Sequence, residues 1–185
     1  MKKLGFMLVV MLSLVQLVSA QQIDSPSGFD KSKLFFGGNF GLNFSSGYSL
    51  INISPQVGYH FTDQFAAGFG LNYIHYGYTD YNNLKYSQNY GGLNVFGRFY
   101  PIRYLFIQAQ PELNYIWGKV KDNSSNEVLY KIPTQLVPSL LLGGGAAIPA
   151  GPGAITISIL YDVIQNQWSP YYHQAIYAFG YNIGL

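Results

Sequence analysis

The sequence feature that most constrains the fold is a regular alternation of two kinds of side chain along short segments. It is clearest in residues 105–117. Large apolar residues occupy one parity there, namely Leu105, Ile107, Leu113, Tyr115 and Trp117. Polar residues occupy the other, namely Gln108, Gln110, Glu112 and Asn114. Strict alternation of this kind predicts a β-strand with two unlike faces.

The same alternation recurs along the chain and predicts eight strands. We expect them near residues 34–43, 51–61, 65–73, 92–99, 105–117, 134–148, 155–162 and 174–185. We expect short connections at 62–64, 101–103 and 149–152, and mostly longer, more polar connections near 45–48, 78–88, 119–131 and 165–171. An even number of strands with short turns at one end is typical of outer-membrane barrels. The predicted fold class is all-β: an eight-stranded antiparallel up-and-down transmembrane β-barrel.

The positions of the charges distinguish a membrane barrel from a soluble, lipocalin-like one. Charged residues make up only 10% of the chain, against about 25% in soluble domains. Only Arg98 and Glu112 lie well inside predicted strands, Asp162 lies at a strand end, and all three share the small-polar parity. A soluble barrel would carry charges on its outer face, whereas a Lys or Arg facing lipid costs about 2–4 kcal/mol. We therefore expect the apolar face to meet lipid and the polar face to line the lumen.

The first twenty residues have the layout of a secretory signal peptide. Lys2 and Lys3 precede an apolar run that ends in Ser19 and Ala20. This pattern predicts cleavage before Gln21, and the absence of Cys rules out a lipid anchor at the cut site. The expected organisation is a signal peptide at 1–20, a periplasmic N-terminal extension at 21–32 and the barrel at 33–185. The predicted location is the outer membrane of a Gram-negative bacterium.

The charges inside the strands define the candidate site, a polar network in the lumen. Its predicted members are Arg98, Glu112, Gln108, Gln110, Asn94, Asn114 and Asp162. A hairpin centred at Ile102 would place Arg98 opposite Phe106 and Glu112 opposite Gly92, so the two charges should connect through Asn and Gln side chains or through partners such as Asp162. Because eight strands enclose a space that side chains can fill, we favour a structural network over a conduction path.

Three prolines conflict with this topology. Pro55, Pro111 and Pro138 fall inside predicted strands, and proline removes a hydrogen bond from the strand ladder. A closed barrel offers no edge for them, so we expect either bulges or shifted strand boundaries.

Enzyme and cofactor chemistry receive little support. The chain has no Cys, and its three histidines, His60, His75 and His173, show no metal-ligand spacing. His75 with Ser87, or His173 with Ser169, are the pairings that an outer-rim hydrolase site would use, but isolated rim histidines explain them better. A net charge of only +2 argues against nucleic acid as a partner. We expect no catalytic residue, no metal and no cofactor.

The signal peptide, the eight alternating segments and the aromatic last strand resemble the small outer-membrane barrels of the OmpA/OmpX type over roughly residues 33–185. In such barrels the last strand is the signal for the insertion machinery. Its counterpart here is Tyr177, Phe179, Tyr181, Ile183 and Leu185. The resemblance implies barrel-assembly machinery, periplasmic chaperones, membrane lipid and lipopolysaccharide as partners, and a monomer. It implies a structural or surface-interaction role through outer loops; a small-solute channel is the alternative, and a lipid A-modifying enzyme is third.

Overall fold

The computed structural model describes residues 30–45 and 48–184 and shows a closed antiparallel barrel with strand order β1 to β8. A short 3₁₀ helix, η1 (Lys31–Lys33), precedes the sheet. The strands are β1 (Leu34–Ser45), β2 (Tyr48–His60), β3 (Phe65–Thr79), β4 (Leu84–Ile102), β5 (Leu105–Asp122), β6 (Val128–Ala150), β7 (Gly153–Asp162) and β8 (Ala175–Gly184). Each pairs with the next, and β1 closes the barrel against β8. The predicted fold class is confirmed, whereas the proposed signal peptide lies outside the described residues.

The outward face of the barrel is apolar, as the alternation predicts. In β5 the buried and exposed residues alternate, with Ile107 56% exposed beside buried Gln108. One row of side chains crosses three strands as Leu71, Leu93 and Leu113, and all three are about half exposed or more. In β6, where the sequence pattern was blurred, Leu136 and Leu142 point outward while Val137 and Leu141 are buried. Among the described residues, no helix has the length and hydropathy required to cross a bilayer.

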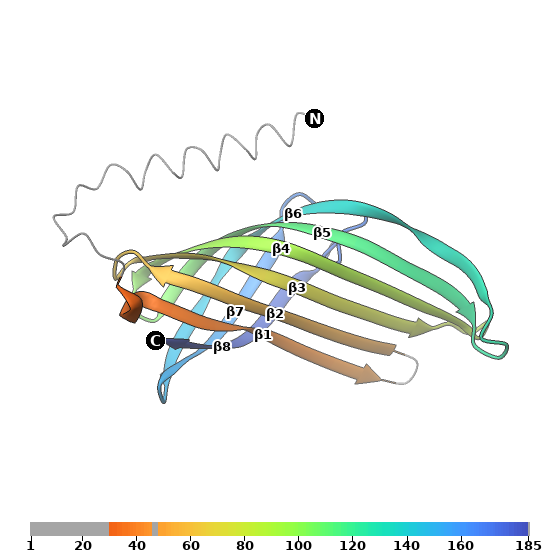
Figure 1. The fold of residues 1–185 in the computed structure, drawn as a ribbon, viewed down its shortest axis with the longest axis horizontal. Coiled ribbons are helices and arrows are strands. Elements are labelled where there is room, and N and C mark those ends of the chain that lie inside the picture. Colours follow the sequence, from red (N-terminus) through yellow and green to blue (C-terminus); the bar gives the residue numbers. More distant parts are fainter. Residues whose placement is uncertain (1–29, 46–47, 185) are drawn as a thin grey trace. The chain divides into compact units, whose positions relative to one another are not determined.

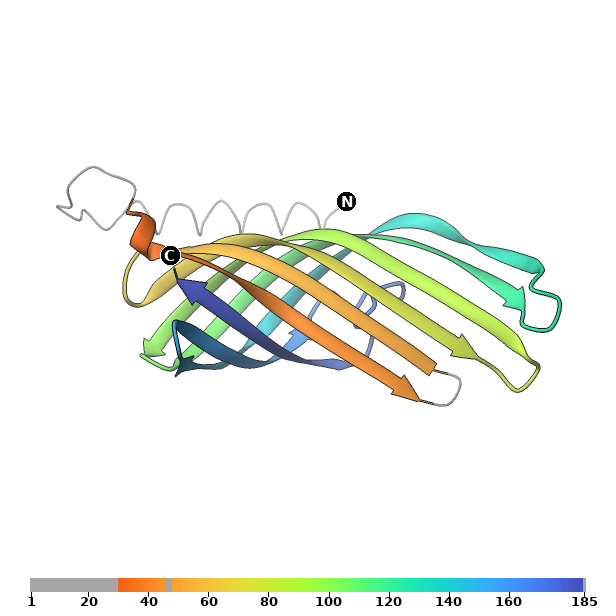
Figure 2. The same ribbon diagram turned by 60° about the horizontal axis from the view of Figure 1, so that its bottom comes forward.

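The strands differ greatly in length, and this asymmetry shapes one end of the barrel. β6 spans 23 residues and β4 spans 19, whereas β7 and β8 span 10 each. Figure 1 shows β4, β5 and β6 running well past the end of β7, and Figure 2 shows the same from a second direction. The expected long loops at 78–88 and 119–131 are therefore mostly strand. The sequence pattern missed these extensions because both faces of a strand outside a membrane can be polar.

The unequal strands explain how the prolines fit. Pro138 pairs with Leu113 of β5, but β6 meets β7 only from Leu141 onward, so Pro138 lies on an open edge. Pro55 pairs with Gly38 on one side, and Pro111 pairs with Leu140 on one side. On the other side of each proline, the pairing with the neighbouring strand has a gap. Each proline thus lies where a ladder hydrogen bond is already absent.

The hairpin between β4 and β5 corrects the expected register. Its turn is formed by residues 103–104, and a register shift lies between Phe99 and Ile102. Arg98 therefore stands opposite Gln108, and Glu112 stands opposite Asn94. The expectation of Phe106 and Gly92 as partners was wrong by two residues: the turn at 103–104, in place of residue 102, moves each partner by three residues, and the register shift takes one of them back.

Candidate functional site

The lumen is closed at the short-turn end by a cluster of aromatic side chains. Phe35, Phe96, Tyr100 and Phe106 are buried there together with Ala66. Their rings lie close to one another, with Phe35 and Phe96 centroids 6.2 Å apart and Tyr100 and Phe106 centroids 5.7 Å apart. Large residues at these inward positions leave little space for water at this end of the lumen.

Arg98 lies directly above this cluster and is only 3% exposed. Its guanidinium carbon is 4.7 Å from the Phe96 ring centroid and 5.1 Å from that of Phe106. The Nε group donates to Gln108 Oε1 at 2.7 Å, and Nη2 donates to Gln56 Oε1 at 3.1 Å. The buried cation is thus held by ring faces and amide oxygens rather than by a carboxylate.

A line of amides on the inner face of β5 connects Arg98 to Glu112. Gln108 Nε2 donates to Gln110 Oε1 at 2.6 Å, and Gln110 Nε2 donates to Glu112 Oε1 at 2.6 Å. Asn114 Nδ2 donates to the second oxygen, Glu112 Oε2, at 3.0 Å. Each glutamine accepts from the side of the cation and donates toward the anion, so the amide dipoles are aligned between the two buried charges.

Two further asparagines join the network from β3 and β4. Asn94 Nδ2 donates to Asn72 Oδ1 at 2.6 Å, and Asn72 Nδ2 donates to Asn114 Oδ1 at 3.5 Å. The network therefore spans β2 to β5. Six of the seven sequence-predicted residues belong to it; sequence reasoning missed Gln56 and Asn72, although both lie on the small-polar parity.

Asp162 belongs to a second polar group and does not join this network through any side-chain hydrogen bond in the described part of the chain. Its Oδ1 accepts from the backbone N–H groups of Leu140 and Ile164, each at 3.1 Å. Its Oδ2 accepts from the Ser169 hydroxyl at 2.8 Å, and that hydroxyl lies 3.1 Å from Ser139 Oγ. The expectation that Asp162 would partner Arg98 or Glu112 is corrected, because Asp162 instead anchors the β7–β8 connection.

That connection, residues 163–174, folds into the end of the lumen opposite the short turns. Tyr171 is 7% exposed and packs within an apolar cluster whose other buried members are Ile74, Tyr90, Ile116, Val137, Leu141 and Leu160. Its hydroxyl interacts with the Glu112 carboxylate. The Tyr76 hydroxyl donates to the Pro170 carbonyl at 3.2 Å. The end opposite the short turns is therefore closed by a loop residue that no periodic pattern could have identified.

Neither candidate enzyme pairing forms a His–Ser hydrogen bond among the described residues. His75 Nδ1 lies 2.7 Å from Asn89 Oδ1, and Ser87 stands opposite Gly77. The Ser169 hydroxyl donates to Asp162, while the His173 ring meets the Tyr172 ring edge-on, with centroids 4.1 Å apart. Within the described residues, no cluster of His, Asp and Glu has the geometry to hold a metal ion.

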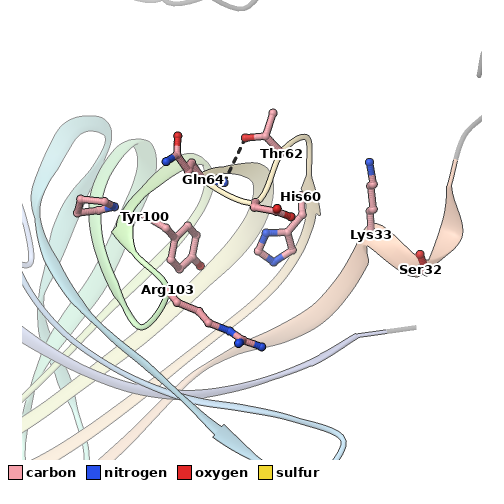
Figure 3. Close-up of a pocket in the computed structure, with 9 residues that line it drawn as sticks. Ser32, Lys33, His60, Thr62, Gln64, Tyr100 and Arg103 are labelled. Atoms are coloured by element: carbon pink, nitrogen blue, oxygen red, sulfur yellow. Dashed lines mark hydrogen bonds between the residues drawn. The ribbon is translucent and has the colours of Figure 1, made fainter. Parts of the chain in front are cut away.

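A hollow of about 700 Å³ opens at the short-turn end, between η1 and the turns that follow β2 and β4. Figure 3 shows Lys33, His60, Tyr100 and Arg103 around it. The His60 ring lies 5.0 Å from Phe35 and 5.8 Å from Tyr100 (centroid distances), so the hollow meets the aromatic cluster. We interpret it as the mouth of a closed barrel.

The closed order of eight antiparallel strands, the apolar exterior and the filled interior define the fold of the small outer-membrane β-barrels. A solved structure with this fold is that of Ail, the attachment invasion locus protein of Yersinia pestis, in complex with the heparin analogue sucrose octasulfate. It is 11% identical, covers 82% of this chain and 94% of its own, and has a TM-score of 0.50. Neisserial surface protein A is 13% identical over 82% of this chain and 95% of its own, with a TM-score of 0.47. No family model and no curated protein matches this chain.

Proposed function

We propose that this chain is an exported, monomeric outer-membrane barrel with a structural or surface-interaction role and no enzymatic activity. The outward rows of Leu, Ile and Phe support membrane insertion, since such a surface would be unfavourable in water. The exposed, alternating residues Tyr177, Phe179, Tyr181 and Ile183 on β8 support recognition by the barrel-assembly machinery, and Leu185 lies outside the described residues. The proposal also includes cleavage of the signal peptide before Gln21. Periplasmic chaperones would then accompany the mature chain to the outer membrane.

The filled lumen disfavours the channel alternative. Aromatic side chains close one end, the Tyr171 cluster closes the other, and hydrogen-bonded amides occupy the space between them. A solute would have to displace buried side chains and break several of these bonds, each of which is costly to leave unmade. Buried charges in this interior have a structural explanation.

The observation that carries the surface-interaction role is the sheet that continues past β7. β6 from Val128 to Ser139 pairs with β5 alone, and its other backbone edge is open as far as Leu140, whose N–H donates to Asp162 and whose carbonyl accepts from Val163 N–H. Val128, Leu129, Tyr130 and Leu136 are between 43% and 61% exposed along it. An open edge with apolar side chains can accept a partner strand, while Pro133 and Pro138 interrupt the edge and limit self-association.

Two measurements test this proposal. The chain contains no Cys, so single cysteines can be placed at Ser124 in the β5–β6 tip and at Thr62 in the β2–β3 turn. A membrane-impermeant maleimide should label the Ser124→Cys protein on intact cells, and should label Thr62→Cys only after the outer membrane is permeabilised. Labelling of both on intact cells, or of neither, would contradict the proposed orientation.

The second measurement separates the alternatives. Refolded mature chain in a planar bilayer should give no steady single-channel openings. Reproducible openings altered by Arg98→Ala or Glu112→Ala would instead establish the channel. Lipid A whose mass changes on expression of the chain would establish the enzyme.

A further inference from the structure

The outward face of β3, β4, β5 and β6 changes character in steps along the strands. The strand pairings define successive rows: Leu71, Leu93 and Leu113; then Tyr73, Gly91, Tyr115 and Leu136; then His75, Asn89 and Trp117; then Gly77, Ser87, Lys119 and Lys131; then Thr79, Lys85, Lys121 and Val128. A leucine row is thus followed by two rows that contain Tyr or Trp, and then by two rows that each contain two lysines. This order matches the passage from hydrocarbon through the interface to the headgroups.

The aromatic step is well packed against the sheet. The Trp117 ring lies over Gly91 on the neighbouring strand, where a Cβ would come within 3.2 Å of two ring carbons. Tyr73 and Tyr115 lie beside it, with ring centroids 6.5 Å and 6.1 Å from that of Trp117. Tyr73 also donates to Asn89 at 3.3 Å. We therefore place the membrane–water interface on this side of the barrel at the level of Trp117.

Four lysines share the outward face immediately beyond Trp117. Lys119 stands directly opposite Lys131, and Lys85 directly opposite Lys121. Lys119 follows Trp117 by two residues, which is about 7 Å along a strand. Like charges directly opposite one another destabilise a sheet, so this arrangement is unfavourable unless an anion lies between the ammonium groups.

The described part of the chain places no such anion against these lysines. Lys121 Nζ donates to Asn126 Oδ1 at 2.8 Å, and none of the four lysines forms an ion pair within residues 30–45 and 48–184. Asp80, Asp122 and Glu127 lie in the adjoining turns; Asp80 and Asp122 accept hydrogen bonds from backbone N–H groups of those turns, and none of the three forms an ion pair with these lysines among the described residues. Four of the eight basic residues that follow the signal peptide (ten in all, less Lys2 and Lys3) are concentrated here.

We propose that Lys85, Lys119, Lys121 and Lys131 form a binding surface for the phosphate groups of outer-leaflet glycolipid, that is, for phosphorylated lipid A headgroups. The surface lies one step above the aromatic level, where such phosphates lie in a bilayer. Adjacent ammonium groups on a flat sheet can share one phosphate or hold two. This inference rests on the proposed outer-membrane location and orientation.

The test uses the mature chain reconstituted into phosphatidylcholine vesicles with and without bisphosphorylated lipid A. For the wild type, lipid A should raise the thermal unfolding midpoint. In neutral vesicles, K119Q/K131Q should be as stable as the wild type or more stable, because the substitution removes like-charge repulsion. In lipid A vesicles the variant should lose most of the increase in thermal unfolding midpoint. Its affinity for labelled lipid A should fall about 25-fold, because each lysine near an anionic surface contributes about fivefold.

The matched control is K31Q/K33Q, which removes the same charge at the other end of the barrel and should keep the full rise. A variant destabilised equally in both vesicle types, or a lipid A effect that K119Q/K131Q retains, would overturn the inference. A rise produced in neutral vesicles by free inorganic phosphate would also overturn it, since the proposed ligand is the lipid. Failure of the wild type to insert into either kind of vesicle would contradict the proposed function itself. Such a failure would be seen as protein that remains in solution, free of vesicles.

Discussion

At the scale of single residues, the stability of the lumen depends on amides that carry no charge. Arg98 and Glu112 do not touch; Gln108 and Gln110 transmit hydrogen bonds between them. Removing an amide from the middle of this line leaves a buried donor and a buried acceptor without partners, which is costly in a water-poor interior.

Gln110→Leu should therefore lower the free energy of unfolding by about 1–3 kcal/mol, measured by urea titration in vesicles. Gln64→Leu provides the control, because Gln64 lies exposed in the β2–β3 turn and its side chain makes no hydrogen bond there among the described residues. If Gln110→Leu is as stable as the control, the amide line does not stabilise the lumen.

Glycine is required where an aromatic ring fills the space beside a strand. A Cβ at Gly58 would overlap the ring of Phe35, whereas a Cβ at Gly41 would meet only Asn52 Cβ, at 3.7 Å. Gly58→Ala should destabilise the barrel by about 1–3 kcal/mol through overpacking. Gly41→Ala should be neutral or up to about 1 kcal/mol stabilising, because it reduces backbone entropy in the unfolded chain. Thermal unfolding of both variants in the same detergent compares them, and equal behaviour would contradict this packing.

At the scale of elements, the β7–β8 connection carries two neighbouring tyrosines with different roles. Only the first of them closes the end of the lumen. Tyr171 is buried against Ile116 and Leu141, whereas Tyr172 is 40% exposed. Tyr171→Ala should lower the free energy of unfolding by about 3–5 kcal/mol, since it leaves a cavity and removes a partner of Glu112. Tyr172→Ala should change it by less than about 1 kcal/mol. Similar losses in the two variants, measured by denaturant titration, would mean that the loop does not pack into the lumen.

The elements also show what the sequence can and cannot predict. Alternation located all eight strands and identified Gln108, Gln110 and Glu112 as inward-facing, because inside a membrane barrel the two faces of a strand meet different surroundings. It did not locate the strand ends near Leu84 and Val128, where both faces lie outside the apolar zone. It also misplaced the centre of the β4–β5 hairpin: the turn lies at residues 103–104 and a one-residue register shift lies between Phe99 and Ile102, so the partners of Arg98 and Glu112 differ by two residues from the expected ones.

The candidate site was predictable to the same extent. Its polar members lie on one parity and are found by pattern, whereas Phe35, Phe96 and Phe106 face inward beside outward apolar residues and give no alternation signal. Tyr171 lies in a connection, where periodicity does not apply. Only the three-dimensional arrangement shows that these residues close the lumen.

At the scale of the whole molecule, the barrel combines an apolar outer surface, a filled interior and a sheet that extends beyond β7. The first feature supports insertion into lipid, and the second disfavours a continuous water path. Together they predict the surroundings of the strand residues at the level of the apolar zone: outward positions contact lipid, and inward positions contact neither lipid nor bulk water.

Site-directed spin labelling along β5 tests that statement most directly, because the chain has no native Cys. Labels at Ile107, Leu113 and Tyr115 should be relaxed by oxygen, which concentrates in lipid, and labels at Gln108 and Asn114 should be shielded from both oxygen and an aqueous nickel chelate. Loss of this period-two alternation, with water access at the outward positions, would show that the barrel is not in a membrane. Strong access of the nickel chelate at Gln108 and Asn114 would show that the lumen is an open aqueous channel.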